Sequence, residues 1–263
     1  MWNGKKVSVI FPTYNEKDSI RAAIEEFFAD GWVDEIVVVD NNAAPGTVEE
    51  VLKTKARIVH EPRQGYGYAI QCGLREASGD YLIVAEPDGT FCGKDVLKLL
   101  AYADDVDVVY GTRTHREFIW SGANMRGFLR WGNWAVAKLI EVLFNTVNLS
   151  DVGCTMRLIR REALAQIQQF CTVGGSAFGP EMMLLSILHG LQIVQIPLSY
   201  LPRVGTSSVT GNPMKALFLG LRMIWLILDY RVRSLARHRL SGRGSRSSAT
   251  GVADRKTCRG ADR

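Results

Sequence analysis

The chain has 263 residues, 47% of them hydrophobic, and a formal net charge of +5. A chain of this length and composition buries one sizeable core, so we expect one large domain with appendages. Its five cysteines are scattered and include no Cys-x-x-Cys pair, which excludes a disulfide framework or a zinc ribbon and favours free thiols in a reducing compartment.

The charge is distributed unevenly. From residue 231 to the end, ten Lys and Arg residues stand against two Asp and Glu residues, so this segment carries +8 and residues 1–230 carry −3. Basic tails are typical of nucleic-acid arms or of attraction to anionic lipid. The first apolar run, residues 7–11, is too short for a signal-peptide core or a membrane span. We therefore expect no signal peptide and a cytoplasmic protein.

Short apolar runs alternate with helical patterns over the first half of the chain. The predicted strands cover residues 7–11, 35–40, 57–60, 81–85 and 106–111. The predicted helices cover residues 17–29, 47–53, 68–77 and 94–103. This alternation predicts an α/β fold, a mostly parallel sheet with helices on both faces, and ligands bind such sheets beyond the carboxyl ends of the strands.

The second half follows a different pattern. Residues 118–145 interleave six Phe and Trp side chains with three cations, which predicts one or two amphipathic helices. The remaining expected elements are a strand at 155–159, helices near 161–169 and 180–189, and a strand at 192–200.

The last predicted helix begins near residue 213. Lys215, Arg222 and Asp229 recur every seven residues and share one stripe, while the rest of residues 214–230 is almost entirely apolar. The uncharged stretches are far shorter than the roughly 20 residues that span a bilayer, so we predict a helix in the membrane interface. A core helix whose polar stripe faces water is the alternative.

Two carboxylates follow the apolar run at 81–85, in the segment Glu86-Pro87-Asp88. Residues i and i+2 of an extended segment point the same way, so Glu86 and Asp88 can converge on one point. Oxygen-only ligands suit Mg²⁺ or Mn²⁺ carrying a phosphorylated substrate. The alternative is an ordinary acidic turn, since Pro-Asp-Gly is a common turn sequence.

The ends of the first two predicted strands also carry polar side chains. The first is followed by Pro12-Thr13-Tyr14-Asn15-Glu16, and the second ends at Asp40. A carboxylate such as Asp40 can accept hydrogen bonds from a ribose or a base edge, and Tyr14 can flank a base. Asn15 as a helix cap is a compatible alternative. The glycine fingerprint for dinucleotides is missing from the first turn, and Gly65-Tyr66-Gly67 predicts a tight turn at a helix start.

Together these segments resemble the family-2 glycosyltransferases with the GT-A fold. The resemblance covers about residues 7–210 and also rests on Arg63-Gln64-Gly65-Tyr66-Gly67-Tyr68-Ala69, Gly111-Thr112-Arg113, Asp151-Val152-Gly153-Cys154-Thr155-Met156-Arg157 and Pro202-Arg203-Val204-Gly205-Thr206-Ser207-Ser208. The last two segments are most similar to those of polyprenol-phosphate (dolichol-phosphate) mannosyl- and glucosyltransferases.

The resemblance implies a catalytic domain at 1–210, with an acceptor region at 118–145, followed by an amphipathic helix at 211–239 and a disordered basic tail at 240–263. The implied donor-binding residues are Pro12, Tyr14, Asn15, Glu16, Asp40, Arg63, Gly65, Pro87, Arg113, Arg203, Ser207 and Ser208. Glu86 and Asp88 would hold Mg²⁺ or Mn²⁺ on the donor diphosphate. Glu86 departs from the family's Asp-x-Asp pair and is one methylene longer, so it would either bind the metal through water or leave Asp88 as the dominant ligand.

The implied reaction is inverting transfer of a hexose, above all mannose, from GDP-mannose or UDP-glucose to polyprenyl monophosphate. A lipid phosphate, with a second pKa of about 6, attacks without a general base. Arg126 and Arg130 share a helix face that could hold this phosphate, with Trp131 and Trp134 in the lipid interface, or they could snorkel over a packed helix. The expected location is peripheral, on the cytoplasmic face of a membrane.

Two other functions stay open. In the first, a sugar hydroxyl is the acceptor and Asp151 is the general base; Asp151 as the cap of a turn is the structural alternative. In the second, the protein is a non-catalytic module that binds nucleotide sugar or lipid, which the altered Glu86-Pro87-Asp88 segment motivates. A nucleic-acid partner rests on the basic tail alone, and we expect none.

Overall fold

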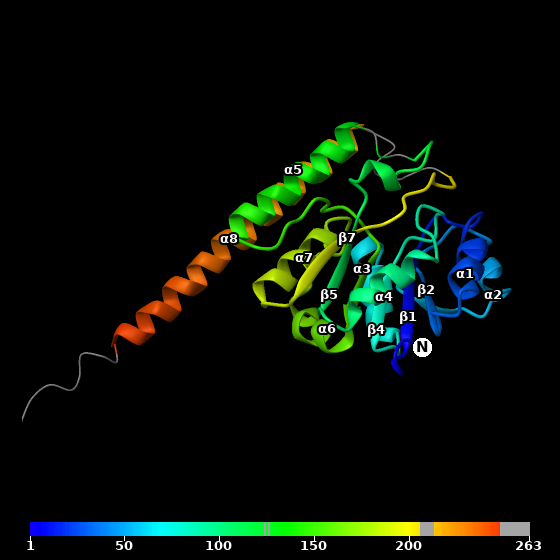
Figure 1. Cartoon of the computed structure of the whole chain (residues 1–263), viewed down its shortest axis with the longest axis horizontal. Helices are drawn as coiled ribbons and strands as arrows, with labels where there is room; N and C mark the ends of the chain where they lie inside the picture. Colours follow the sequence, from blue (N-terminus) through cyan, green and yellow to red (C-terminus); the bar gives the residue numbers. More distant parts are fainter. Residues whose placement is uncertain (124, 126, 206–212, 248–263) are drawn as a thin grey trace, which may run out of the picture.

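The computed structural model describes residues 1–123, 125, 127–205 and 213–247 (Figure 1). The strands of this part are β1 (Val7–Thr13), β2 (Glu35–Asp40), β3 (Arg57–His60), β4 (Tyr81–Val84), β5 (Val108–Thr112), β6 (Arg157–Arg160) and β7 (Ile193–Pro197). The α-helices are α1 (Ile20–Ala29), α2 (Thr47–Leu52), α3 (Tyr66–Glu76), α4 (Asp95–Ala103), α5 (Gly127–Phe144), α6 (Arg161–Ile167), α7 (Phe178–Leu188) and α8 (Pro213–Ser247). Short 3₁₀ turns cover Arg116–Phe118 and Gln168–Phe170.

All seven strands form one sheet in the order β3-β2-β1-β4-β6-β5-β7. β6 runs antiparallel to its neighbours β4 and β5, and every other pair is parallel. The α/β fold with a mostly parallel sheet, predicted from the alternating pattern, is therefore confirmed. The carboxyl ends of β1, β2, β4 and β5 meet at one edge of the sheet, where the polar motifs of the sequence lie.

Hydrophobic side chains cover both faces of the sheet, because successive residues of a strand point to opposite sides. Val7, Val9 and Phe11 of β1 pack in one cluster with buried residues of α1 and α4. Ile10 belongs to the opposite cluster, with buried residues of α3, α6 and α7. Helices on both faces are what the near-continuous apolar strands require.

α5 and α8 lie side by side outside these layers and extend away from the sheet (Figure 1). Val136, Ala137 and Ile140 of α5 join the same cluster as Met223 and Ile227 of α8. One face of each helix is therefore part of the core. Among the described residues, no helix combines the length and the apolar content needed to cross a membrane.

The element boundaries differ from the predictions mainly around the cavity described below. The strand expected at 155–159 is β6, which begins at Arg157, because the Thr155 side chain instead donates to Glu86. The strand expected at 192–200 ends at Pro197, and beyond it Tyr200 exchanges backbone hydrogen bonds of 2.8 and 2.9 Å with Phe118 and Trp120. The region at 118–145 contains one helix, α5, rather than two.

Close packing of α3 on the sheet depends on Gly73. A Cβ at this position would lie 2.3 Å from Cγ2 of Ile10 and 2.9 Å from Cγ2 of Val39, both fully buried. We predict that Gly73→Ala lowers the free energy of unfolding by about 1–2 kcal/mol, because overpacking outweighs the better helix propensity of alanine. Urea unfolding measures the change. Gly127→Ala in α5, where a Cβ meets nothing within 4 Å, is the matched control and should not lose stability.

Candidate active site

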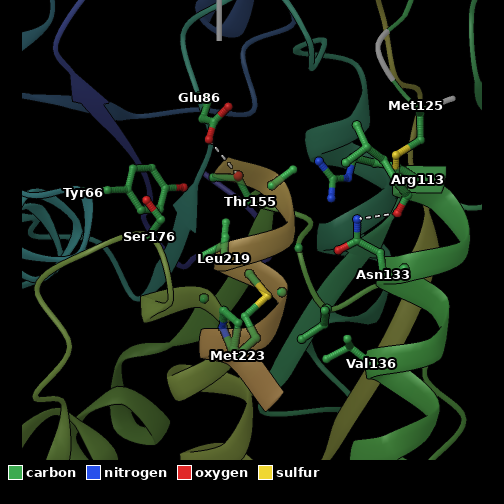
Figure 2. Close-up of a pocket in the computed structure, with 18 of the residues that line it drawn as sticks. Tyr66, Glu86, Arg113, Met125, Asn133, Val136, Thr155, Ser176, Leu219 and Met223 are labelled. Atoms are coloured by element: carbon green, nitrogen blue, oxygen red, sulfur yellow. Dashed lines mark hydrogen bonds between the residues drawn. The ribbon is translucent and has the colours of Figure 1, made fainter. Parts of the chain in front are cut away.

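A cavity of about 650 Å³ lies beyond the carboxyl ends of the strands and continues between α5 and α8 (Figure 2). Its polar end is lined by Tyr14, Asn15, Glu16, Glu86, Arg113, Thr155 and Arg203. Its apolar end is lined by Leu129 and Val136 of α5 and by Leu217, Leu219, Leu221, Met223 and Ile224 of α8. One continuous space therefore joins a charged region to a hydrophobic groove.

Glu86 and Asp88 converge as their spacing predicts. One guanidinium nitrogen of Arg203, Nη2, lies 2.7 Å from Oε2 of Glu86 and also forms an ion pair with Oδ2 of Asp88. Thr155 donates to Oε1 of Glu86 at 2.9 Å, and the backbone N–H of Thr90 donates to Oδ1 of Asp88 at 2.9 Å. The two carboxylates thus share one cation and keep their outer oxygens fixed by hydroxyl and amide donors.

Burial and the negative charge of Asp88 raise the pKa of Glu86 to about 7, although the positive charge of Arg203 opposes them. Two carboxylates this close repel each other, and either a shared proton or a cation at the point where they meet relieves that repulsion. Arg203 supplies that cation from the loop after β7. This loop is held in place by a 2.8 Å hydrogen bond from the backbone N–H of Val204 to the backbone oxygen of Asp88.

The same carboxylates fit a hard divalent cation. Oδ2 of Asp88 is buried, and its contact is the ion pair with Arg203, whose place a metal ion could take. Within the described residues, no group of three or more His, Cys, Asp and Glu side chains could hold a metal. The protein would therefore supply two carboxylates, and a Mg²⁺ or Mn²⁺ ion would take its other ligands from water and phosphate oxygens, as these ions commonly do.

Arg113 is held by Asp151 through a fully satisfied ion pair. Oδ2 of Asp151 accepts from the backbone N–H and Nε of Arg113 at 3.0 and 2.9 Å, and Oδ1 accepts from Nη2 of Arg113 and the N–H of Gly153 at 3.1 and 2.9 Å. The Arg113 guanidinium also stacks 5.2 Å from the ring centroid of Tyr200. Nη1 of Arg113 makes none of these contacts. Because Arg113 lines the cavity, this group can donate hydrogen bonds to a ligand there.

This geometry does not suit Asp151 as a general base. Its carboxylate is fully buried and its four lone-pair sites are all used. Burial alone would raise the pKa of Asp151, but the charge and hydrogen bonds of Arg113 outweigh it and lower that pKa. A general base must be within reach of the proton that it abstracts. Asp151 instead positions Arg113.

The end of β1 and the turn after it line the cavity with Pro12, Tyr14, Asn15 and Glu16, all expected to bind the donor. Oε2 of Glu16 accepts from the backbone N–H groups of Tyr14 and Asn15 at 2.6 and 2.8 Å. Glu16 therefore shapes this turn, while the half-exposed ring of Tyr14 is available to a ligand.

The end of β2 differs from the expectation. Asp40 does not line the cavity: its oxygens lie 2.9 Å from the backbone nitrogen of Ala43 and 3.2 Å from Nδ1 of His60. Its neighbour Asn41 does line it, and Oδ1 of Asn41 accepts from the N–H of Gly65 at 2.8 Å. The following amide, rather than the predicted carboxylate, faces the cavity.

Other predicted site residues lie outside the cavity lining. Arg63 donates from Nε to Oε1 of Glu61 at 2.9 Å, so its charge is used beside the site rather than in it. Gly65, Pro87 and Arg130 do not line the cavity either. The predictions for Arg126, Ser207 and Ser208 fall outside the described residues.

Several lining residues were not predicted, namely Asn41, Tyr66, Asn133, Thr155, Arg157, Ser176 and Tyr200. Thr155 and Arg157 stand in the Asp151–Arg157 motif without an assigned role. Arg157 is buried and donates to the carbonyls of Thr155 and Gly179 at 3.0 Å each. Asn133 had no signal in the sequence, because it is one polar residue within an aromatic-rich helix.

Comparisons with known proteins agree with this architecture. The model of the family described as glycosyl transferase family 2 matches residues 8–168. A dolichyl-phosphate hexose transferase of Haloferax volcanii is 30% identical over 231 residues, which cover 86% of this chain and 96% of the relative. An uncharacterized glycosyltransferase of Mycobacterium tuberculosis is 27% identical over 227 residues, 86% of this chain and 99% of the relative.

Solved structures show the same fold. Glucosyl-3-phosphoglycerate synthase from M. tuberculosis, in complex with Mn²⁺, UDP and glucosyl-3-phosphoglycerate, superposes with a TM-score of 0.66 and 20% identity, over 87% of this chain and 80% of the synthase chain. Because the family model covers more than half of the chain and the sheet has the GT-A arrangement, this protein belongs to glycosyl transferase family 2 and is a glycosyltransferase.

Proposed function

We propose that this glycosyltransferase moves a hexose, mannose first among the candidates, from a nucleotide-sugar donor to the phosphate of a polyprenyl monophosphate. The observation that carries the proposal is the cavity, which runs from Glu86, Arg113 and Arg203 into an apolar groove between α5 and α8. An acceptor that fills both ends has a charged head and a long apolar tail. The similarity to a dolichyl-phosphate hexose transferase supports the same acceptor class.

The state of Asp151 favours a phosphate acceptor over a sugar hydroxyl. A hydroxyl nucleophile needs a base, and Asp151, the candidate base, has all its lone-pair sites used by Arg113 and Gly153. A phosphate monoester is mostly ionised near neutral pH and needs none. Its oxygen forms the new bond to the anomeric carbon while the bond from that carbon to the donor's diphosphate breaks, so one displacement inverts the centre.

The arginines of the cavity have distinct tasks in this proposal. Arg113, fixed by Asp151, directs its Nη1 group to the acceptor phosphate. Glu86 and Asp88 hold Mg²⁺ or Mn²⁺, which offsets the charge of the departing diphosphate when it is bound. Arg203 balances both carboxylates in the structure and lies close enough to contact the donor's phosphates once a metal takes over that role.

The outer faces of α5 and α8 support a location on the membrane surface. Phe128 and Trp131 of α5 are 66% and 69% exposed, and Phe218 and Trp225 of α8 are 65% and 67% exposed. Isolated exposed apolar residues are common, but a row of large aromatics on two adjacent helices is typical of an interaction face. Arg222 and the basic segment from residue 231 would attract the anionic cytoplasmic leaflet.

A donor and acceptor screen tests the function. Radiolabelled GDP-mannose, UDP-glucose and UDP-N-acetylglucosamine are each incubated with polyprenyl phosphate in detergent or with 3-phosphoglycerate, with and without Mn²⁺. We expect one donor to yield a product that is extracted into organic solvent. Transfer to 3-phosphoglycerate alone, or no lipid-linked product from any donor, would contradict the proposal.

The metal site gives a second prediction. Asp88→Asn removes the charge of a buried carboxylate that would hold the metal, so Mn²⁺ binding measured by electron paramagnetic resonance should be lost and turnover should fall by about 100-fold or more, since a metal contributes several kcal/mol to such reactions. Asp105→Asn, which changes an exposed carboxylate after α4, is the control and should bind Mn²⁺ normally. Undiminished Mn²⁺ binding by Asp88→Asn would remove Asp88 as a ligand.

The membrane face gives a third prediction. Trp225→Glu should weaken binding to vesicles that contain anionic phospholipid by roughly tenfold or more, because burying a large apolar side chain contributes about 1.5–3 kcal/mol. Co-sedimentation with vesicles measures the affinity. Tyr102→Glu on α4, a similarly large but half-exposed aromatic far from α8 in the chain, should bind like the wild type. Equal losses in both variants would show that α8 is not the contact face.

A further inference from the structure

The Tyr66 hydroxyl is a polar group without a use in the functions described so far. Tyr66 is the first residue of α3, its ring packs against the core, and it lines the cavity. Its oxygen is buried and makes no hydrogen bond of normal geometry with any described residue. A ligand in the cavity could therefore form a hydrogen bond with this hydroxyl.

Backbone hydrogen bonds hold the start of α3, where Tyr66 lies, against the loop before α7. The carbonyl of Gly174, in the loop before α7, accepts from the N–H groups of Gly67 and Tyr68 at 2.9 and 3.2 Å. The same loop brings Ser176 to the cavity beside Tyr66 (Figure 2). Two hydroxyls from different elements therefore line one wall of the cavity.

The hydroxyl is directed toward the charged end of the cavity. Figure 2 shows Tyr66 pointing to Thr155, whose own hydroxyl donates to Glu86 at 2.9 Å. Burial and the charges of Glu86 and Asp88 raise the pKa of Tyr66, so it stays protonated and can donate a hydrogen bond. The carboxylates of Glu86 and Asp88 repel an anion that is not bound through a metal. A neutral polyol is not repelled, and its hydroxyl groups can both donate to and accept from the hydroxyls of Tyr66 and Ser176.

We propose that Tyr66, with Ser176, forms the subsite that binds the hydroxyls of the donor's hexose. The inference rests on the proposed transfer reaction. In that reaction the sugar must lie between the departing diphosphate and the attacking phosphate. Tyr66 lies to one side of the space between Glu86 and the Leu219 and Met223 side chains of α8, with its hydroxyl directed toward Thr155 (Figure 2).

Tyr66→Phe tests the subsite because it removes only the hydroxyl. Binding of GDP, UDP, GDP-mannose and UDP-glucose is measured by calorimetry with Mn²⁺ and without acceptor. We expect the nucleoside diphosphate to bind the variant as it binds the wild type, and the matching nucleotide sugar to bind roughly tenfold more weakly, the effect of about one lost hydrogen bond. Tyr68→Phe is the control, since the Tyr68 ring lies 4.5 Å under Arg63 and outside the cavity lining.

The unliganded variant provides an independent readout. Since Tyr66→Phe keeps the ring that packs against the core, its thermal unfolding midpoint should stay close to that of the wild type, which shows that a loss of affinity reports the hydroxyl and not the fold. The subsite is wrong if nucleotide sugar and nucleoside diphosphate bind the variant equally well, or if only the affinity for polyprenyl phosphate falls. If wild-type protein transfers hexose and the variant does so with unchanged kcat/KM, this inference fails while the proposed function stands. If the wild type binds no nucleotide sugar, both fail.

Discussion

Two carboxylates placed one residue apart at the end of a buried strand repel each other, and the architecture around the cavity supplies a cation that both share. Glu86 and Asp88 directly follow β4, in the middle of the sheet. Their cation, Arg203, comes from the loop after β7, 117 residues later. The loop can reach them because its backbone pairs with residues 88 and 90. The ion pair thus joins the loop after β7 to the centre of the sheet.

The second charged pair, Arg113 and Asp151, is buried, and its hydrogen bonds fix the orientation of the arginine side chain. Arg113 and Asp151 are both withdrawn from water, and such a pair is stabilising only when every donor and acceptor is matched. Here the carboxylate is fully matched, while the guanidinium keeps one group for the cavity. The arginine is therefore held in one orientation before any ligand arrives, which is the arrangement that favours binding of a phosphate.

The sequence was sufficient to predict features that depend on local pattern. Apolar runs and the positions of Glu86 and Asp88 follow from residue spacing, so the strands and the convergence of the carboxylates could be predicted. The saturation of Asp151 could not, because it depends on Arg113, 38 residues earlier, and on a backbone turn. Asp40 and Asn41 show the same limit: adjacent residues point in opposite directions, and the sequence does not indicate which one faces the cavity.

Helix α8 was expected either in the membrane interface or in the core, and in the structure one face of it packs on the core while other residues are exposed. Met223 and Ile227 are buried, whereas Phe218 and Trp225 are exposed. A hydrogen bond attaches α8 to α7, since the Tyr230 hydroxyl donates to Oε1 of Glu181 at 2.9 Å.

Glu181 is fully buried and also accepts from the N–H groups of Thr172 and Val173, at 3.1 and 2.9 Å. These residues begin the loop that carries Gly174 and Ser176 to the cavity. A single carboxylate therefore fixes both α8 and one cavity wall. Because the apolar groove has α8 as its second side, the groove exists only while that helix is docked on the core. The same helix thus provides both exposed aromatic side chains and one wall of the apolar groove, so under the proposed function the lipid tail and the membrane would meet the protein at the same helix.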